Sequence, residues 1–502
     1  MPTDPAPEHE ARTGTAPSAG RPAAEVLAGL RSLRADDAPT RGGRTFAYVY
    51  DAGLEGLDEL AAAAYTAFST VNGLDPTVFP SVARLENDLV GAAVALLGVP
   101  GAQGTFTSGG TESILLAVKT ARDHARAVRG IIRPRMVLPS TAHAAFHKAA
   151  AYLGVEPVVV PVDPDTFRAD AAAMAAALTG DTVLVVASAP SYAHGVLDPV
   201  AEIAAAAAGR GVLCHVDACI GGWLLPHLRR AGQEVEPFDL SVPGVTSLSV
   251  DLHKYAYADK GASVVLYRDA ELRRHQYFAH AGWPGYPVVN PTAQGTKSGG
   301  LLAQAWAVLR HIGEDGYTAL AGRVATASAR LLAGLRATEG IRVLGDPAAG
   351  LVAFTVLSPG DGRDPDLSLL LHLADEMREL GWYLQPQLSF DGLPPNLHLT
   401  LTPATVGRVD ALLADLSTAL AKARALEPVT VDPALAGLAA GLDPQRLGPE
   451  EVAAFLAFAG LGEGAGTGLP ARMAPVLVLL DALPGPLKER LLAEFIGSLF
   501  RV

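Results

Sequence analysis

The chain has 502 residues, of which 49% are hydrophobic and 18% are charged. This composition is typical of a soluble globular protein, and the length is sufficient for a large core and two packed domains. The 39 basic and 52 acidic residues give a formal net charge of −13. Because nucleic acids and anionic membranes are bound by basic surfaces, this charge argues against both partners, and an anionic ligand must be held by a local site.

Residues 1–43 are predicted to form a disordered arm. They are rich in alanine, proline and charged residues, and they contain no apolar core of the kind found in signal peptides or membrane anchors. The two cysteines, Cys214 and Cys219, lie five positions apart and would point to opposite faces of a strand. We therefore expect no disulfide and a location in the reducing cytoplasm.

Residues 44–100 contain two helical patterns on either side of a loop at 70–76. After a strand that ends near Phe106, short runs that are apolar throughout alternate with alanine-rich helices. Such runs predict strands buried on both faces of a mostly parallel sheet. The runs are 136–138, 155–162, 183–187, 212–216, 245–250 and 262–267. Only a short loop separates the last two runs, which allows one antiparallel strand near the end of the series.

A helix at 301–312 is expected to lead from a large domain, residues 101–312, into a smaller C-terminal domain, residues 313–427. The smaller domain is predicted to be an α/β sandwich. Its strands are expected at 350–357, 381–385 and 396–402, and its helices at 367–380 and 406–426. Residues 428–502 are predicted to form a helical tail on the small domain, with a glycine-rich loop at 460–468 and an amphipathic helix at 486–499.

Lys254 is the residue of greatest chemical interest. It comes just after an apolar segment, residues 242–250, that predicts a strand. A single lysine is usually a solvated surface charge, but a lysine at the mouth of a sheet, beside His253, can act as a Schiff-base nucleophile. We expect burial near other cations to lower the pKa of Lys254 and to favour the free amine.

Two further segments supply what such a lysine needs. Asp217 ends the strand at 211–216, where its carboxylate would either cap the strand or keep the pyridine nitrogen of a cofactor protonated. Residues 108–111, Ser-Gly-Gly-Thr, join a strand to a helix, and the free N–H groups at a helix start suit a phosphate. This turn is a weak signal alone, but followed by Asp217 and Lys254 it predicts pyridoxal 5'-phosphate (PLP). A nucleotide site lacks support, because the chain has neither a Walker lysine nor a Gly-x-Gly-x-x-Gly turn after a strand.

His143 and His147 lie four positions apart, a spacing that can place both on one helix face. The adjacent glutamate of zinc proteases is missing, so we expect no metal. We expect His143 to stack on an aromatic cofactor and His147 to lie on the surface. Among the tryptophans, Trp283 lies in a loop rich in glycine, proline and tyrosine and is the best candidate to line a substrate site.

These motifs resemble the sphingosine-1-phosphate lyase branch of the group II pyridoxal-phosphate decarboxylase family, which has fold type I. The resemblance runs from about residue 45 to the C-terminus. The segments that carry it are residues 72, 79–81, 107–114, 143–146, 215–218, 251–255, 260–261 and 474–499. It implies an α/β fold with a mostly parallel seven-stranded sheet in the large domain and a smaller C-terminal α/β domain.

The resemblance also implies a role for each matching residue. The catalytic residues would be Lys254, which bonds to the cofactor, Asp217, which pairs with its pyridine nitrogen, and His143, which stacks on its ring. The other cofactor-binding residues would be Ser108, Gly109, Gly110, Thr111, Ser249, His253, Gly295 and Thr296, the last two from a loop that family dimers lend across their interface. The substrate-binding residues would be Asn72 and Lys260. Trp283 and Tyr286, in a loop that differs from the family's, and Lys297, where the family has an arginine, are further substrate-binding candidates of this sequence.

We therefore expect a cytoplasmic, homodimeric PLP-dependent lyase without a membrane anchor. It would cleave the Cα–Cβ bond of a phosphorylated β-hydroxy amine and release an aldehyde and a small amino phosphate. The alternative is an amino-acid α-decarboxylase of the group II type, which an arginine or histidine positioned for a substrate carboxylate would favour. A third hypothesis, a cofactor-binding protein without catalysis, is disfavoured because a silent relative need not keep Lys254, Asp217 and His143 together.

Overall fold

The computed structural model describes residues 19–500 except 349, 361, 432–436, 438, 440, 449 and 453–469. Residues 40–426 form one compact unit, and residues 1–39 together with 427–502 form another. The expected domain boundaries at 100 and 312 fall inside the first unit, and the division of the chain at these positions stays a prediction.

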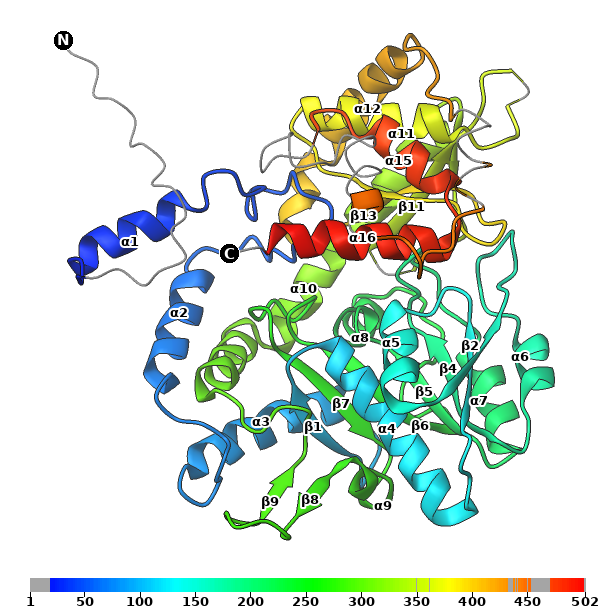
Figure 1. The fold of residues 1–502 in the computed structure, drawn as a ribbon. Coiled ribbons are helices and arrows are strands. Elements are labelled where there is room, and N and C mark those ends of the chain that lie inside the picture. Colours follow the sequence, from blue (N-terminus) through cyan, green and yellow to red (C-terminus); the bar gives the residue numbers. More distant parts are fainter. Residues whose placement is uncertain are drawn as a thin grey trace. The chain divides into compact units, whose positions relative to one another are not determined.

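A seven-stranded sheet forms the centre of the unit 40–426 (Figure 1). Its strands are β1 (Gln103–Thr107), β2 (Arg135–Pro139), β3 (Glu156–Val160), β4 (Thr182–Ser188), β5 (Leu213–Asp217), β6 (Val245–Asp251) and β7 (Ser263–Tyr267). The strand order is β1-β7-β6-β5-β4-β2-β3. Only β7 is antiparallel to its neighbours, β1 and β6. The prediction of a mostly parallel sheet with one late antiparallel strand is therefore confirmed.

Helices cover both faces of this sheet. On one face lie α4 (Gly110–Arg129) and α5 (Ala144–Leu153), and on the other lie α3 (Pro80–Leu97), α7 (Val200–Ala208) and α8 (Gly221–Arg230). Successive residues of a strand point to opposite faces. Within β2, Met136 accordingly packs in one hydrophobic cluster and Val137 in the other. Because both faces of these strands are buried, apolar residues occur throughout their sequences.

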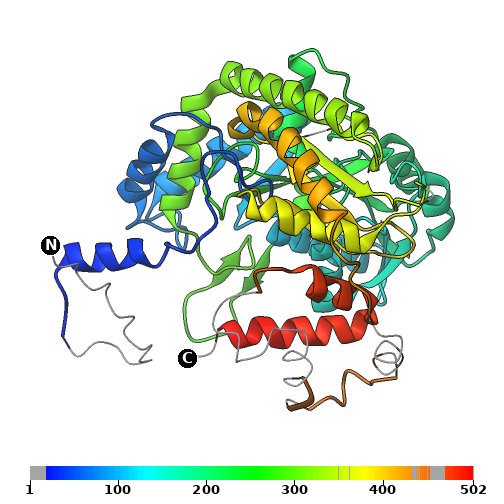
Figure 2. The same cartoon turned by 90° about the horizontal axis from the view of Figure 1, so that it is seen from above.

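A second sheet of four antiparallel strands lies C-terminal to the first. It contains β10 (Ile341–Val343), β11 (Leu351–Val356), β12 (Gln385–Gln387) and β13 (Asn396–Thr400), in the order β10-β11-β13-β12. Helix α12 (Val409–Ala423) packs between α10 (Gly299–Ala337) and α11 (Leu367–Glu379) (Figure 2). The sequence missed β10, and it placed the strand now called β12 at 381–385, four residues too early.

Helix α10 is longer than the predicted helix at 301–312. It continues across a break at Gly313, whose φ of 64° and ψ of 170° are not helical. Glycine tolerates this positive φ, so the chain can change direction there without a strained side chain. The predicted end of the helix therefore coincides with its break.

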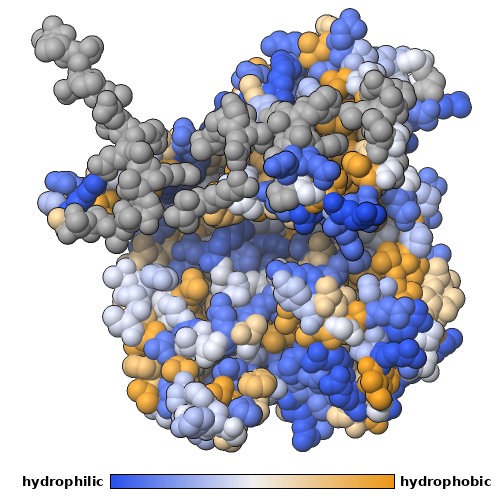
Figure 3. Space-filling view, in the orientation of Figure 1, coloured by the Kyte–Doolittle hydropathy of each residue, from blue (hydrophilic) through white to orange (hydrophobic). Residues whose placement is uncertain are grey.

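Two short strands, β8 (Phe278–His280) and β9 (Val288–Asn290), form a hairpin that the sequence did not predict. All three residues of β8 are exposed. On the face of the unit 40–426 seen in Figure 3, apolar side chains are interspersed with polar ones, as is usual for protein surfaces. N-terminal to the large sheet, α2 (Leu57–Phe68) precedes α3, as the two helical patterns predicted.

The other unit contains α1 (Ala23–Ser32), α15 (Ala474–Ala482) and α16 (Gly485–Leu499). Helix α1 corrects the prediction that residues 1–43 are disordered throughout. Its residues are all exposed, and the alanine-rich composition that suggested disorder also has a high helix propensity. Helix α16 confirms the predicted helix at 486–499, whereas the glycine-rich loop at 460–468 lies outside the described residues. Within the described part of the chain, no helix is both long and apolar enough to span a bilayer.

Candidate active site

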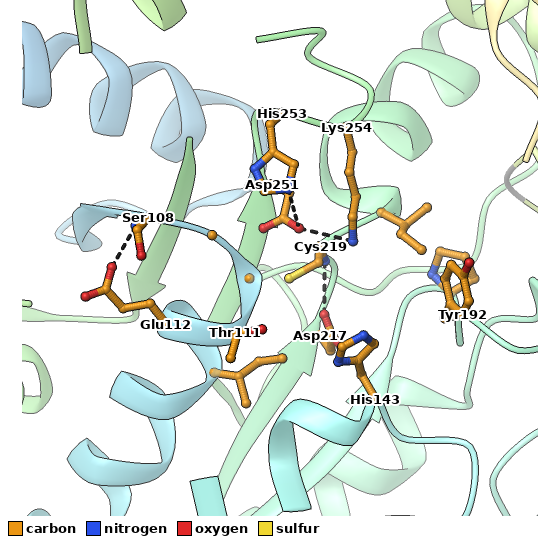
Figure 4. Close-up of a pocket in the computed structure, with 15 residues that line it drawn as sticks. Ser108, Thr111, Glu112, His143, Tyr192, Asp217, Cys219, Asp251, His253 and Lys254 are labelled. Carbon is orange, nitrogen blue, oxygen red and sulfur yellow. Dashed lines mark hydrogen bonds and ion pairs between the residues drawn. The ribbon is translucent and has the colours of Figure 1, made fainter. Parts of the chain in front are cut away.

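A cavity of ≈ 300 Å³ lies at the carboxyl ends of the strands of the large sheet (Figure 4). Parallel strands bring the residues that follow them to one edge, which is where α/β proteins bind ligands. The sheet topology therefore brings together segments that are far apart in the sequence. Of the predicted site residues, Ser108, Gly109, Gly110, Thr111, His143, Asp217, His253 and Lys254 line this cavity.

One end of the cavity is the turn from β1 into α4. The backbone N–H of Ser108 donates to Glu112 (2.6 Å), and the hydroxyls of Thr107 and Ser113 lie 2.6 Å apart. A Cβ on Gly110 would lie 2.9 Å from both carboxylate oxygens of Asp251, so only glycine permits this close approach. The first N–H groups of α4, which have no partner within the helix, point out of this turn and can hold a phosphate.

Asp217 ends β5 and is fixed by several hydrogen bonds. Its Oδ1 accepts from the backbone N–H of Cys219 (3.1 Å) and from the hydroxyl of Ser249 (3.3 Å). Behind it, the ring nitrogens of His215 lie 2.9 Å and 3.3 Å from the hydroxyls of Ser247 and Ser249. Burial lowers the pKa of His215 to about 4, so a neutral ring supports the carboxylate.

Lys254 lies three residues beyond the end of β6, and its Nζ is 3.1 Å from Asp251 Oδ2. Burial alone would lower the pKa of Lys254, but the charge of Asp251 outweighs burial, and the pKa is raised above its ordinary value. The same pairing holds the pKa of Asp251 below its ordinary value, although burial acts in the opposite direction. The expectation of a lowered pKa for Lys254 is therefore wrong for the chain alone, because it did not foresee this carboxylate.

His143 is the N-cap of α5, where its Nδ1 accepts from the backbone N–H of Ala145 (3.2 Å). The ring stands edge-on to Tyr192, with centroids 6.5 Å apart. Figure 4 shows His143 beside Asp217. His147 is exposed, as predicted. No cluster of potential metal ligands occurs among the described residues.

Two further predicted residues, Ser249 and Lys260, do not line the cavity. Ser249 is fully buried, and its hydroxyl donates to Asp217 Oδ1. Lys260 lies with its Nζ 5.2 Å from the ring centroid of Tyr50. Burial and the charge of Lys254 lower the pKa of Lys260.

The other predicted substrate and loop residues lie away from this cavity. Lys297 donates to both oxygens of Glu86 (2.7 and 2.6 Å) and to the carbonyl of Phe106 (3.1 Å). The remaining residues are Asn72, Trp283, Tyr286, Gly295 and Thr296. Thr296 donates to Asn72 Oδ1 (3.3 Å). The indole of Trp283 donates to the carbonyl of Tyr286 (2.6 Å), and the two side chains are 45% and 58% exposed.

Sequence reasoning missed several residues that line the cavity, chiefly Asp251, Cys219, Glu112 and Tyr192. Asp251, Cys219 and Glu112 lie within or beside the recognised motifs. Their closeness in the sequence to Lys254, Asp217 and Ser108 could have marked them as candidates. Tyr192 follows the carboxyl end of β4, and this position alone could have marked it as a candidate.

The cavity fits PLP. The helix start and His253 at one end suit its phosphate, and the Asp217 carboxylate suits its pyridine nitrogen. Between them, His143 offers a flat ring and Lys254 an amine, both facing the same space. These donors and acceptors belong to four different segments of the chain and meet only here.

Comparisons with known proteins agree with this geometry. A family model described as the pyridoxal-dependent decarboxylase conserved domain matches residues 42–357. The chain belongs to this family. A second model, of a C-terminal domain of pyridoxal-dependent enzymes named for the helix-turn-helix motif, matches residues 433–498.

Similar proteins carry a more specific name. The chain is 39% identical to a sphingosine-1-phosphate lyase of Arabidopsis thaliana over 84% of this chain and 76% of that protein. It is 38% identical to sphingosine-1-phosphate lyase 1 of Rattus norvegicus over 77% of this chain and 66% of that protein. A solved sphingosine-1-phosphate lyase from Burkholderia pseudomallei superposes with a TM-score of 0.76 at 37% identity, covering 83% of this chain and 96% of that one.

The family member described here is thus a PLP-dependent lyase with fold type I. Both central predictions from the sequence, the cofactor and the fold, are confirmed.

Proposed function

We propose that this lyase cleaves the Cα–Cβ bond of a phosphorylated β-hydroxy amine, as in sphingosine 1-phosphate, and releases an aldehyde and a small amino phosphate. The observation that carries the proposal is the cavity that joins Lys254, Asp217 and His143 to the helix start of α4, in a chain 39% identical to a sphingosine-1-phosphate lyase. The similarity to these lyases supports the choice of the Cα–Cβ bond. The residues of the cavity support the use of PLP to break it.

PLP, when bound, accepts the electron pair left on Cα when a bond to that carbon breaks. The residues of the chain hold it for this purpose. The N–H groups at the start of α4 and His253 would bind its phosphate, and the carboxylate of Asp217 would keep the ring nitrogen protonated. His143 would cover one face of the ring, and Lys254 would provide the amine that attaches to the cofactor. With Lys254 so engaged, Asp251 would lose its ion pair with that lysine and keep its contact with His253 Nε2, 3.6 Å from its Oδ2.

The choice of bond depends on the groups that face the substrate. A decarboxylase needs a cation for the substrate carboxylate. No arginine is found among the described side chains that line the cavity, and its two histidines, His143 and His253, are proposed to hold the cofactor. Lys260, whose pKa is lowered by burial and by the charge of Lys254, is proposed instead to bind a substrate phosphate. This contrast favours cleavage of the Cα–Cβ bond over decarboxylation.

A neighbouring subunit is part of the proposal. The loop that contains Gly295, Thr296 and Lys297 lies outside the cavity of its own chain. The hairpin residues Trp283 and Tyr286 are largely exposed. We propose that both segments reach the cavity of the partner in a homodimer. Mixing Lys254→Ala protein with an inactive variant of the 295–297 loop should then restore activity, because one site of the mixed dimer carries neither change. A fully active monomer in sedimentation would exclude this arrangement.

The reaction itself is tested by incubating the holoenzyme with phosphorylated amino alcohols and with amino acids, and by measuring aldehyde and carbon dioxide separately. Aldehyde from the phosphorylated amino alcohols is expected. Carbon dioxide without aldehyde would establish the decarboxylase instead.

The role of Lys260 is tested with the same substrates. Lys260→Ala should weaken phosphate-bearing substrates by roughly 10- to 100-fold, the value of one charge-assisted contact, and dephosphorylated ones far less. Lys148→Ala, on the exposed side of α5, provides the control and should leave both unchanged. Equal losses for both classes of substrate would show that Lys260 does not bind phosphate.

We also propose a cytoplasmic location. Cys214 and Cys219 are both free and buried, which is compatible with a reducing compartment.

A further inference from the structure

Tyr192 lines the cofactor cavity and is held by two residues of the smaller sheet. It lies in the loop after β4, which is closed by a hydrogen bond from the backbone N–H of Gly195 to the carbonyl of Ser191 (2.9 Å). Its ring stacks on His398, with centroids 4.5 Å apart and an interplanar angle of 25°. Its hydroxyl donates to Gln385 Oε1 at 2.5 Å. The orientation of this tyrosine is therefore set by residues far from it in the sequence.

Gln385 and His398 act as a pair. They are direct cross-strand partners in the ladder between β12 and β13, so their side chains lie on the same face of the sheet. His398 is fully buried, and burial lowers its pKa to about 4, so the ring that stacks on Tyr192 is neutral. His398 fixes the plane of the Tyr192 ring, and Gln385 fixes the direction of its O–H bond.

This arrangement decides what Tyr192 can offer a ligand. A phenol has one hydrogen to donate and two lone pairs that accept. The hydrogen is used by Gln385, so only lone pairs of the oxygen remain for any other partner. Burial raises the pKa of Tyr192, and the side chain therefore remains a neutral phenol. It can accept a hydrogen bond from a hydroxyl group but has no hydrogen left for a carbonyl or ether oxygen.

We infer that Gln385 is a positioning residue that makes Tyr192 an acceptor for the β-hydroxyl group of the substrate, with His398 holding the ring. The inference rests on the proposed function. The amine of such a substrate is taken by the cofactor and its phosphate by cationic groups, so the β-hydroxyl is the donor that remains for Tyr192. Anchoring this hydroxyl fixes the Cα–Cβ bond relative to the cofactor, so Gln385 contributes to substrate specificity through Tyr192.

The test compares Gln385→Met, which removes the acceptor at similar length, with Gln385→Glu, which keeps an acceptor. Each holoenzyme is titrated with an amino phosphate that bears a β-hydroxyl group and with its deoxy analogue, and binding is followed by the absorption of the bound cofactor. Gln385→Met should reduce the preference for the hydroxyl about tenfold, the value of one hydrogen bond, while cofactor content stays unchanged. Gln385→Glu should keep the preference within about threefold of the wild type.

Two further variants separate positioning from a general structural effect. In a Tyr192→Phe background, Gln385→Met should change the preference no further, because residues that act as a unit are not additive. Gln387→Met, at the same strand but opposite Asn396, is the matched control and should behave like the wild type. The inference is overturned if Gln385→Met keeps the full preference, if Gln385→Glu loses it equally, or if the effect persists without the Tyr192 hydroxyl.

The titrations do not require bond cleavage, so the two proposals can fail separately. Coupling between Gln385 and Tyr192 without aldehyde release from any amino phosphate would refute the proposed reaction alone. Aldehyde release without this coupling would refute the positioning role alone.

Discussion

Acid should destabilise this protein through its buried histidines, and His194 allows the effect to be measured one residue at a time. His194 is 3% exposed, and its ring stacks on Phe167 with centroids 4.3 Å apart. Burial lowers its pKa to about 4, whereas the unfolded value is about 6.5. The unfolded chain therefore binds more protons than the folded one between these values. The stability that neutral His194 provides is present above about pH 6.5 and is lost as the pH falls toward 4.

The magnitude follows from the two pKa values. At pH 5, roughly 97% of the unfolded side chains are protonated but only about 10% of the folded ones. The free energy of unfolding should therefore fall by about 2 kcal/mol between pH 7 and pH 5 on account of His194 alone. The free energy of unfolding of a domain is commonly only about 5–15 kcal/mol. The contribution of His194 is therefore a measurable fraction of it.

The assay is urea unfolding of the holoenzyme at pH 7 and pH 5, for the wild type and for His194→Leu. Between pH 7 and pH 5, the free energy of unfolding should fall by about 2 kcal/mol less in the variant than in the wild type. This difference does not depend on the stability of the variant at pH 7. The exposed His147 provides the control, and His147→Leu should show the pH dependence of the wild type. An equal loss in the wild type and in His194→Leu would refute the argument, because it would mean that His194 has the same pKa in the folded and unfolded chains.

Two other predictions concern the cofactor. Reduction of the holoenzyme with borohydride should fix the cofactor covalently to the wild type but not to Lys254→Ala, as seen by peptide mass analysis; fixation to another lysine would remove the central assignment. Gly110→Ala should weaken cofactor binding roughly 5- to 150-fold, because the added Cβ would lie 2.9 Å from the Asp251 carboxylate and such overpacking costs about 1–3 kcal/mol. Gly180→Ala, where nothing lies within 4 Å of the new Cβ, should bind the cofactor normally, and a similar affinity for both variants would contradict the steric argument.

The strands of the large sheet were predictable because each is buried on both faces. A run such as β4, in which all seven residues are buried, carries an apolar signal that no loop imitates. The hairpin β8–β9 was not predictable, because three residues per strand are too few for a periodic pattern and their side chains are largely exposed. Helix α1 was missed for a related reason, since no residue of it is buried to create an apolar stripe.

The sequence by itself determined the residues that follow the strand ends. Asp217 and Lys254 could be proposed as cofactor-binding residues because the chemistry of PLP requires a carboxylate and a lysine, and because the ends of parallel strands meet at one edge. These assignments depend on local patterns and on the order of motifs, which are fully present in the sequence.

Only the tertiary structure decided the contacts that tune these residues. The pKa of Lys254 rises because Asp251 Oδ2 lies 3.1 Å from its Nζ, and the sign of such a shift depends on distance and burial together. Gln385 contacts Tyr192 although the two are 193 positions apart, and the register of β12 on β13 adds His398 to the same contact. Sequence patterns report which face of an element is buried, whereas hydrogen bonds and charges depend on distances of a few ångströms that are fixed only when the elements pack.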